Sequence, residues 1–336
     1  MKTFIIAEAG VNHNGSLEMA LQLVHSAKKA GAYAVKFQSF KADDIATANA
    51  PKAEYQNAND NSAAQIDMLR RLELTDNDFL IIADECRNIG IEFMSTPFSI
   101  KAARFLNDLG MRTWKIPSGE ITNLPLLRCI ASMPGKVIMS TGMATLAEIN
   151  DAVQILISAG ADPSQLYLLH CTTAYPTPYD QVNLRAMQTL TQFNVGGVGY
   201  SDHTPGTVVS IAAVAAGAQI IEKHFTVDRN LPGPDHKASI TPDMLTRMIQ
   251  DIRIIEKAMG SDLKQPVEAE LTNIPVARKS IVAACPIAIG DIFTETNLTA
   301  KRPGTGISPM KWDSLIGKKA KKTYSIDQFI DNSELL

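Results

Sequence analysis

The chain has 336 residues, of which 32 are Lys or Arg and 35 are Asp or Glu, so its formal net charge is −3. A charge this close to balance excludes a protein whose main partner is nucleic acid or an anionic membrane. With 45% hydrophobic and 20% charged residues, the composition is that of a globular protein and excludes a disordered or collagen-like chain.

The N-terminal sequence, the apolar stretches and the cysteines together predict a cytoplasmic protein. The N-terminal sequence MKTFIIAEAGV has a very short apolar run broken by Glu8, which predicts a first strand rather than a secretion signal. The longest uncharged stretch, residues 206–221, is rich in Ala and Gly and falls short of a bilayer span, so no transmembrane helix is predicted. The four cysteines have no CxxC spacing and need no disulfide role in a reducing compartment.

Short apolar runs rich in β-branched residues alternate with segments of helical period up to about residue 258. Helical patterns lie at 17–30, 76–88, 146–159 and 207–216, among others. Thr145 and Glu148 fit a capping box, and Thr75 precedes an acidic first turn. The predicted strands are 4–7, 34–38, 92–95, 113–116, 137–140, 166–170, 197–200 and 220–224. Eight βα units over about 250 residues predict a (β/α)₈ TIM barrel, with a doubly wound open sheet as the alternative.

Two regions depart from this alternation. A polar insertion between Lys41 and Leu74 is predicted to form an extended loop after the second strand, a common place for an active-site cover. The barrel is predicted at 1–259, a linker at 260–276 and a small domain at 277–336. About 60 residues is near the lower limit for an independent core, so this domain would gain stability on the barrel or on a second subunit. Its KKAKK cluster favours a solvated basic face over a nucleic-acid site.

Polar side chains collect at the predicted C-terminal ends of all eight strands, where TIM barrels carry their active sites. Five of the six histidines fall there or in the loops that follow; only His25 lies within a helix. His203 and His224 end neighbouring strands. Two histidines with open positions suit a divalent ion such as Mn²⁺ or Mg²⁺ used as a Lewis acid, although they would also accept Zn²⁺. Any single histidine could equally be a hydrogen-bonded structural residue.

Lys36 and Lys115 lie inside apolar strands, where an unpaired ammonium is costly, so each must meet an anion or lose its proton. Hydroxyls and glycines in IPSGE and MSTGM add donors typical of a phosphate or carboxylate cradle. Two alternatives stay open. Both lysines could lie beside a structural carboxylate, or one of them could be the Schiff-base lysine of an aldolase. Asp235, in a Pro- and Gly-rich loop, and Arg302, before a Pro-Gly turn, are further candidates; ordinary loop chemistry and solvation explain them equally well.

The motifs EAGVNHNG, VKFQSF, STPF, KIPSGE, STGM, HCTTAYPTP, YSDHT, EKHF, GPDHKAS and KRPG follow one another as they do in sialic acid synthases, and the chain resembles that family over nearly its whole length. The C-terminal segment is similar to the family's antifreeze-like (SAF) domain. The resemblance implies a homodimeric transferase. Such an enzyme condenses phosphoenolpyruvate with an N-acylated mannose-type sugar to form a nine-carbon ulosonic acid, releasing phosphate and using a divalent metal.

The resemblance also implies roles for individual residues. His203 and His224 would hold the metal. Glu120 would assist proton or water handling, with Glu8 and Asp235 as further catalytic residues. Arg302 would bind the N-acetyl group in the barrel of the other subunit of a domain-swapped dimer. The sugar would be faced by Glu8, Gln38, Tyr175 and Asp235. Phosphoenolpyruvate would be bound by Lys36, Thr96, Lys115, Ser118, Ser140 and Ser201.

Departures from the sialic acid pattern bear on the acceptor. Members that make N-acetylneuraminate typically read KHQTH where this chain reads KFQSF, and have Asn in place of Thr173. The motifs KFQSF, PSGEITNLP and HCTTAYP are more similar to those of the N,N′-diacetyllegionaminic acid synthase branch, whose acceptor is 2,4-diacetamido-2,4,6-trideoxymannose. Phe37 and Phe40 fit such a 6-deoxy sugar, because a pocket built for a hydroxyl would leave polar groups unpaired. The alternatives are a synthase using N-acetylmannosamine, a Schiff-base pyruvate aldolase and a non-catalytic sugar-binding protein.

Overall fold

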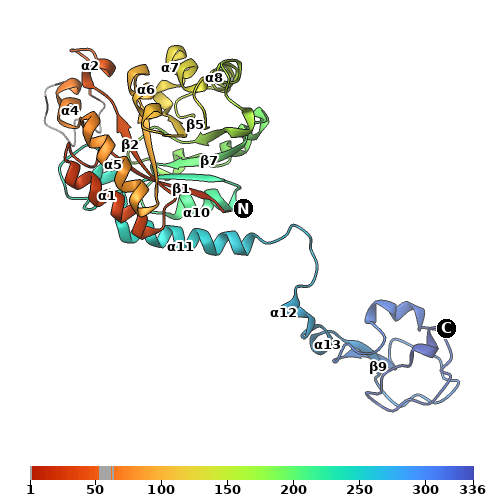
Figure 1. Cartoon of the computed structure of the whole chain (residues 1–336). Coiled ribbons are helices and arrows are strands. Elements are labelled where there is room, and N and C mark those ends of the chain that lie inside the picture. Colours follow the sequence, from red (N-terminus) through yellow and green to blue (C-terminus); the bar gives the residue numbers. More distant parts are fainter. Residues whose placement is uncertain (1, 53–61, 63) are drawn as a thin grey trace. The chain divides into compact units, whose positions relative to one another are not determined.

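The computed structural model describes residues 2–52, 62 and 64–336 and divides the chain into two compact units, Met1–Gly260 and Ser261–Leu336 (Figure 1). Within those ranges, every helix is too short or too polar to cross a membrane.

The first unit is a closed barrel of parallel strands. Hydrogen-bonded neighbours follow the order β3-β2-β1-β8-β7-β6-β5-β4, and β3 also contacts β4, so the sheet closes on itself. The predicted (β/α)₈ fold is confirmed, and the open-sheet alternative is wrong because the two ends of that order meet. The strands are β1 Phe4–Gly10, β2 Ala34–Ser39, β3 Glu92–Pro97, β4 Thr113–Ile116, β5 Lys136–Ser140, β6 Leu166–His170, β7 Gly197–Asp202 and β8 Ile220–His224.

Helices cover the outside of the barrel (Figure 1). Both predicted N-terminal signals are present: Thr145 and Glu148 exchange side-chain and backbone hydrogen bonds at the start of α8, and Thr75 and Asp78 do the same at α5. Such reciprocal bonds satisfy amides that the first helical turn leaves without partners. The helices are α1 Leu17–Ala30, α5 Asp76–Ile89, α6 Ile100–Asp108, α7 Leu124–Ala131, α8 Leu146–Ser158, α9 Ala186–Thr189, α10 Val208–Ala215 and α11 Pro242–Met259.

The insertion after β2 differs from the predicted extended loop. Its described part contains two short helices, α2 Ala42–Ile45 and α4 Gln65–Arg71, while residues 53–61 and 63 of the predicted cover lie outside the described residues. The amide of Ala42 donates to the Glu73 carboxylate at 2.7 Å, which holds the two ends of the insertion together. Met68 of α4 and Leu72 at its end also pack against Val11, which follows β1. These contacts anchor the insertion to the barrel.

The barrel interior begins with an apolar layer at the amino ends of the strands. Side chains of β1, β2, β3, β5, β6 and β8 meet there, and all of them are buried. Because residues two apart on a strand face the same side, the next inward positions of β1 and β8 are Glu8 and Glu222. The layer comprises Ile6, Ala34, Met94, Ile138, Leu169 and Ile220.

The second unit has its own apolar core around Phe293, Leu315 and Tyr324. Its antiparallel pair is β9 Ser280–Ala283 and β10 Leu298–Lys301, preceded by α12 Glu268–Leu271 and α13 Ile274–Ala277, which fall largely within the stretch predicted as a linker.

The lysine cluster of the second unit holds the chain's own last residues. Lys318 Nζ donates to the carbonyl oxygen of Leu335 at 3.0 Å, and Lys321 Nζ donates to that of Ser333 at 2.7 Å. Lys322 pairs with Asp331 at 2.6 Å. These contacts give the basic run a structural role.

Candidate active site

A cavity with about 620 Å³ of empty space lies at the carboxyl ends of the barrel strands. Most of the residues predicted for the site line it: Glu8, Lys36, Gln38, Thr96, Lys115, Ser118, Ser140, Tyr175, Ser201, His203 and His224. Parallel strands in register bring them together, because Glu8 is paired with Lys36 on one side and with His224 on the other. The closed sheet thus gathers residues far apart in sequence around one centre.

Lys36 is the centre of a buried ion network. Its Nζ lies 2.7 Å from Glu8 Oε2 and 3.6 Å from Glu222 Oε2, and it donates to Thr96 Oγ1 at 3.0 Å. Burial disfavours the charge on Lys36, but the carboxylates of Glu222 and Glu8 outweigh it and raise the pKa of this lysine. Lys36 is therefore a fixed cation in the cavity.

Lys115 reaches the same network from β4, which is separated from β2 by β3 alone. Its Nζ lies 3.5 Å from Glu222 Oε1, and burial lowers its pKa because one shared carboxylate only partly offsets the lost solvation. Burial alone would raise the pKa of Glu222, but Lys115 and Lys36 together hold it well below its usual value. Two lysines thus share Glu222, whose Oε1 also accepts a hydrogen bond from Ser201 at 2.9 Å.

Glu8 is the carboxylate of the site suited to exchanging protons. Burial raises its pKa to about 7, although Lys36 opposes the shift, and the nearby Glu222 charge adds to it. Gln38 donates to Glu8 Oε1 at 3.3 Å. A carboxyl group that titrates near neutral pH can act as either acid or base.

His203 and His224 lie side by side at the ends of the neighbouring strands β7 and β8, with ring centroids 5.5 Å apart, and both line the cavity. His203 Nδ1 lies 2.7 Å from the carbonyl oxygen of Thr172; since a carbonyl only accepts, Nδ1 carries the proton and Nε2 keeps its lone pair. His224 Nδ1 is buried and has no hydrogen-bond partner in the described part of the chain. Tyr175 packs against His203 with centroids 4.2 Å apart.

Both imidazoles are held neutral. Burial lowers the pKa of His203 to about 4 and that of His224 well below its usual value. Neutral imidazoles with unshared nitrogens, one of them oriented by a backbone carbonyl, are typical metal donors. Within residues 2–52, 62 and 64–336 no group of three or more His, Cys, Asp or Glu side chains could hold a metal ion. The protein would therefore supply two ligands and leave the remaining positions to water or substrate.

A second cavity of about 470 Å³ adjoins the first, since Gln38, Tyr175 and His224 line both. Asp235, predicted to face the sugar, lies in this second cavity, and burial raises its pKa to about 6. The opposite side is formed by Val11 and by residues of α4.

Two predicted residues lie elsewhere. Glu120 ends the 3₁₀ turn Ser118–Glu120, where its Oε2 accepts a hydrogen bond from Asn123 Nδ2 at 2.6 Å, and it lines neither cavity. Arg302 belongs to the second unit, and its Nε donates to the carbonyl oxygen of Ala277 at 3.1 Å. Their roles stay predictions.

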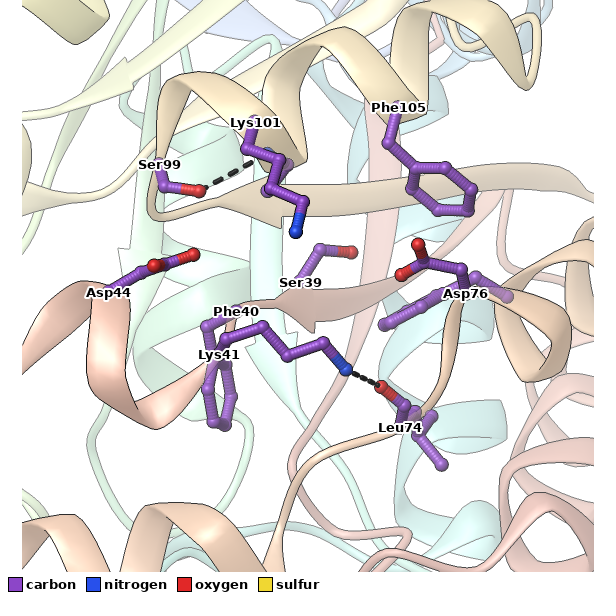
Figure 2. Close-up of a pocket in the computed structure, with 11 residues that line it drawn as sticks. Ser39, Phe40, Lys41, Asp44, Leu74, Asp76, Ser99, Lys101 and Phe105 are labelled. Carbon is purple, nitrogen blue, oxygen red and sulfur yellow. Dashed lines mark hydrogen bonds between the residues drawn. The ribbon is translucent and has the colours of Figure 1, made fainter.

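Phe37 and Phe40 line neither cavity. Phe37 lies between the inward-facing Lys36 and Gln38, so the alternation of β2 turns it into the buried layer outside the barrel. Phe40 lines a separate outer pocket of about 410 Å³ (Figure 2). In that pocket Lys41 Nζ donates to the carbonyl oxygen of Leu74 at 3.0 Å.

Several residues that line the first cavity were not predicted from the sequence to bind substrate or metal. Glu222 is the most important of them, because both cavity lysines depend on it. The pattern EKHF places it two residues before His224, hence on the same side of the strand, and this spacing is the signal that could have found it. The others are Phe98, Pro117, Gly119, Cys171 and Thr173.

Comparison with known proteins decides the family. The profile of the NeuB family matches residues 23–264, and that of the SAF domain matches residues 278–336. The chain belongs to the NeuB family. NeuB-family relatives include two N,N′-diacetyllegionaminic acid synthases. The Campylobacter jejuni protein is 50% identical, over 98% of this chain and 99% of its own length. The Legionella pneumophila protein is 45% identical, over 97% and 92%.

A solved structure supports the same relationship. The N-acetylneuraminic acid synthetase of Leptospira borgpetersenii, crystallised with citrate, superposes with a TM-score of 0.72 at 34% identity, over 82% of this chain and 90% of that chain. These comparisons confirm the predicted sialic acid synthase-type family, the prediction that the chain is a synthase, and the SAF domain at its C-terminus.

Proposed function

We propose that this NeuB-family chain condenses phosphoenolpyruvate with 2,4-diacetamido-2,4,6-trideoxymannose and water, giving N,N′-diacetyllegionaminic acid and phosphate. The observation that carries the proposal is the junction of the two cavities at His224, where a cationic cavity meets a second one of sugar size. The similarity to two diacetyllegionaminic acid synthases selects the acceptor.

Phosphoenolpyruvate belongs in the cavity that holds Lys36 and Lys115. Two ammonium groups offset the phosphate and carboxylate charges, and hydroxyls of the surrounding strand ends add donors. Ser140 Oγ is buried and lacks a hydrogen-bond partner among the described residues, so it is available to such an anion.

His203 and His224 would hold a divalent ion, Mn²⁺ or Mg²⁺, because both are neutral and each keeps a nitrogen lone pair. Such an ion supplies Lewis acidity for the aldehyde oxygen of the open-chain acceptor. Tyr175, packed against His203, helps to fix the ring orientation and lines the junction.

Carbon–carbon bond formation joins C3 of phosphoenolpyruvate to the aldehyde carbon. The positive charge that develops at C2 is met by water, and the resulting tetrahedral intermediate expels phosphate by C–O cleavage. Lys36 and Lys115 hold the phosphate charge throughout. We assign proton exchange with the water to Glu8 rather than to Glu120, because Glu8 lines the cavity and titrates near pH 7.

The direct test is phosphate release with Mn²⁺, phosphoenolpyruvate and one acceptor at a time. We expect the 2,4-diacetamido sugar to outpace N-acetylmannosamine, and the reverse ranking would assign the chain to neuraminate synthesis. His224→Ala should nearly abolish metal-dependent turnover, whereas His25→Ala, at an exposed ion pair on α1, should not. Borohydride treatment with pyruvate should trap nothing; covalent capture on a lysine would favour the aldolase.

The SAF domain is proposed to serve the barrel of a second subunit in a domain-swapped homodimer, with Arg302 binding the acceptor's acyl group. Mixing His224→Ala chains with Arg302→Ala chains tests this. In a swapped dimer, each heterodimer has one site with both residues intact, so a refolded 1:1 mixture should recover about a quarter of wild-type activity. No recovery would place Arg302 in its own chain's site, and full activity of Arg302→Ala alone would place it outside any site.

A further inference from the structure

The second cavity has one apolar wall. Val11 follows β1, and Met68, Leu69 and Leu72 come from α4 and its C-terminal end. The polar side chains of the cavity, Gln38, Asp235 and His224, come from other elements. One face of an otherwise polar sugar site is thus made of hydrocarbon and thioether groups.

This wall is held in place from behind. Val11, Phe40, Met68 and Leu72 form one buried cluster, against which Leu69 and Phe98 pack. Phe40 belongs to this cluster and lines the separate outer pocket rather than the second cavity (Figure 2). Phe40, the second aromatic residue of KFQSF, therefore supports the wall, and residues of the insertion after β2 form most of its surface.

The chemistry of the reaction orients the acceptor. Its C1 aldehyde must lie at the junction near His224, beside phosphoenolpyruvate, so the rest of the carbon chain extends into the second cavity. The end farthest from C1 is C6. A hydroxyl at C6 would lose its water hydrogen bonds against an apolar surface, whereas a methyl group would gain apolar burial there.

We infer that Met68, Leu69 and Leu72 determine acceptor specificity by receiving the C6 methyl group of a 6-deoxy sugar. The inference rests on the proposed function and adds to it the residues that distinguish 6-deoxy from 6-hydroxy acceptors. Met68 and Leu72 are 2% and 7% exposed, so they are already packed and the wall exists before the sugar binds. Preorganised apolar contacts of this kind discriminate by about 10- to 100-fold.

Two acceptors that differ by a single oxygen atom provide the test: 2,4-diacetamido-2,4,6-trideoxymannose and its 6-hydroxy analogue, 2,4-diacetamido-2,4-dideoxymannose. The measured quantity is the ratio of their kcat/KM values with the full-length enzyme, which does not depend on the folded fraction of a preparation. Wild type should prefer the methyl acceptor by about 10-fold or more. Met68→Gln and Leu69→Asn should each lower this ratio about fivefold or more, with the KM for phosphoenolpyruvate unchanged.

Ile66→Asn is the matched control, since Ile66 is a buried residue of the same helix outside the lining of either cavity. An unchanged ratio in both wall variants, or an equal fall in Ile66→Asn, would overturn the inference. Equal use of the two acceptors by wild type would overturn it while leaving the proposed function standing. Turnover of N-acetylmannosamine but of neither diacetamido sugar would instead refute the proposed function.

Discussion

The two ends of the barrel interior are built from the same strands, but one end is filled with apolar side chains and the other with charged ones. On β1, Ile6 lies in the apolar layer at the amino end, and two residues later Glu8 is a buried ion at the carboxyl end. On β8, Ile220 and Glu222 repeat this change. Two inward-facing residues in succession on one strand can thus serve different purposes, the first in core packing and the second in the active site.

The difference separates stability from function within one core. Apolar layers stabilise because they remove hydrocarbon from water. Buried ion networks such as that of Lys36, Glu8 and Glu222 are weak sources of stability, because desolvation offsets most of the attraction. We therefore expect substitutions at the carboxyl end to affect catalysis and those at the amino end to affect folding.

The largest expected effect is on catalysis. Lys115→Met removes one of the two cations proposed to hold phosphoenolpyruvate, and kcat/KM should fall about 100- to 1,000-fold. The free energy of unfolding should change little, because Glu222 keeps Lys36 as its partner. Steady-state kinetics and urea denaturation of the same preparation check both parts. If Lys115→Met kept full activity and lost stability, the carboxyl end would contribute to folding rather than to catalysis, contrary to the proposal.

At the amino end the opposite result is expected. Ile138→Ala leaves a cavity in the apolar layer and should destabilise the protein by about 2–5 kcal/mol, with unchanged kcat per folded molecule. Ser140→Ala, two residues along the same strand β5, is the matched control: it should weaken phosphoenolpyruvate binding and leave the unfolding midpoint nearly unchanged. Loss of kcat in folded Ile138→Ala would show that the two ends are coupled.

Much of this arrangement is predictable because strands repeat every two residues. Apolar runs located the eight strands, and polar residues at their ends located the cavity. The same alternation, applied to β2, would have turned Phe37 outward, since Lys36 and Gln38 face inward. Residues on strands were thus the easiest to place.

Residues outside the strands were harder to place. The helices of the insertion are short, so their helical period is too brief to detect from sequence. Residues of α4 pack on Val11 and Phe40, and such tertiary contacts stabilise a short helix. Glu120 lies in a turn whose direction no periodicity fixes. The network around Glu222 depends on which strands become neighbours after closure, and local sequence does not contain that information.

A third prediction concerns the outer side of the same strand ends. Asp202 and Lys223 directly precede the two histidines, and their buried side chains lie 3.0 Å apart. Lys223 Nζ also donates to the carbonyl oxygen of Thr204 at 2.6 Å, so the pair braces His203 from both sides. Replacing both by apolar residues, Asp202→Leu with Lys223→Met, should weaken Mn²⁺ binding about 10-fold. It should also lower the stability, because Thr204 and Ser210 lose the carboxylate that accepts their hydrogen bonds.

Calorimetric titration of Mn²⁺ without substrates measures that effect. The matched control is the double variant Arg253→Met with Glu256→Leu, which removes an ion pair of α11 that contacts Thr3 at the amino end of the barrel. It should leave Mn²⁺ affinity unchanged. Equal affinity in both double variants would mean that the Asp202–Lys223 pair does not position the histidines.

The smallest expected effect joins stability and function in one residue. Burial raises the pKa of Asp235 from 3.8 to about 6, so its carboxylate, the form that accepts a bond from a sugar hydroxyl, is lost below neutral pH. The KM for the acceptor should rise about fourfold between pH 7 and pH 5.5. The folded protein holds this proton more tightly than the unfolded chain, so the residue's contribution to stability is full below pH 3.8 and is lost as pH rises through about 6.

Activity and stability should therefore change in opposite directions with pH at this one carboxyl group. Asp235→Asn should raise the KM at all pH values and remove its fourfold pH dependence, while making the unfolding free energy less sensitive to pH between 4 and 6. Acceptor titrations and urea denaturation at matched pH values measure the two trends. If the KM of the Asn variant kept the wild-type pH dependence, another group would control acceptor binding, and burial of Asp235 would affect folding alone.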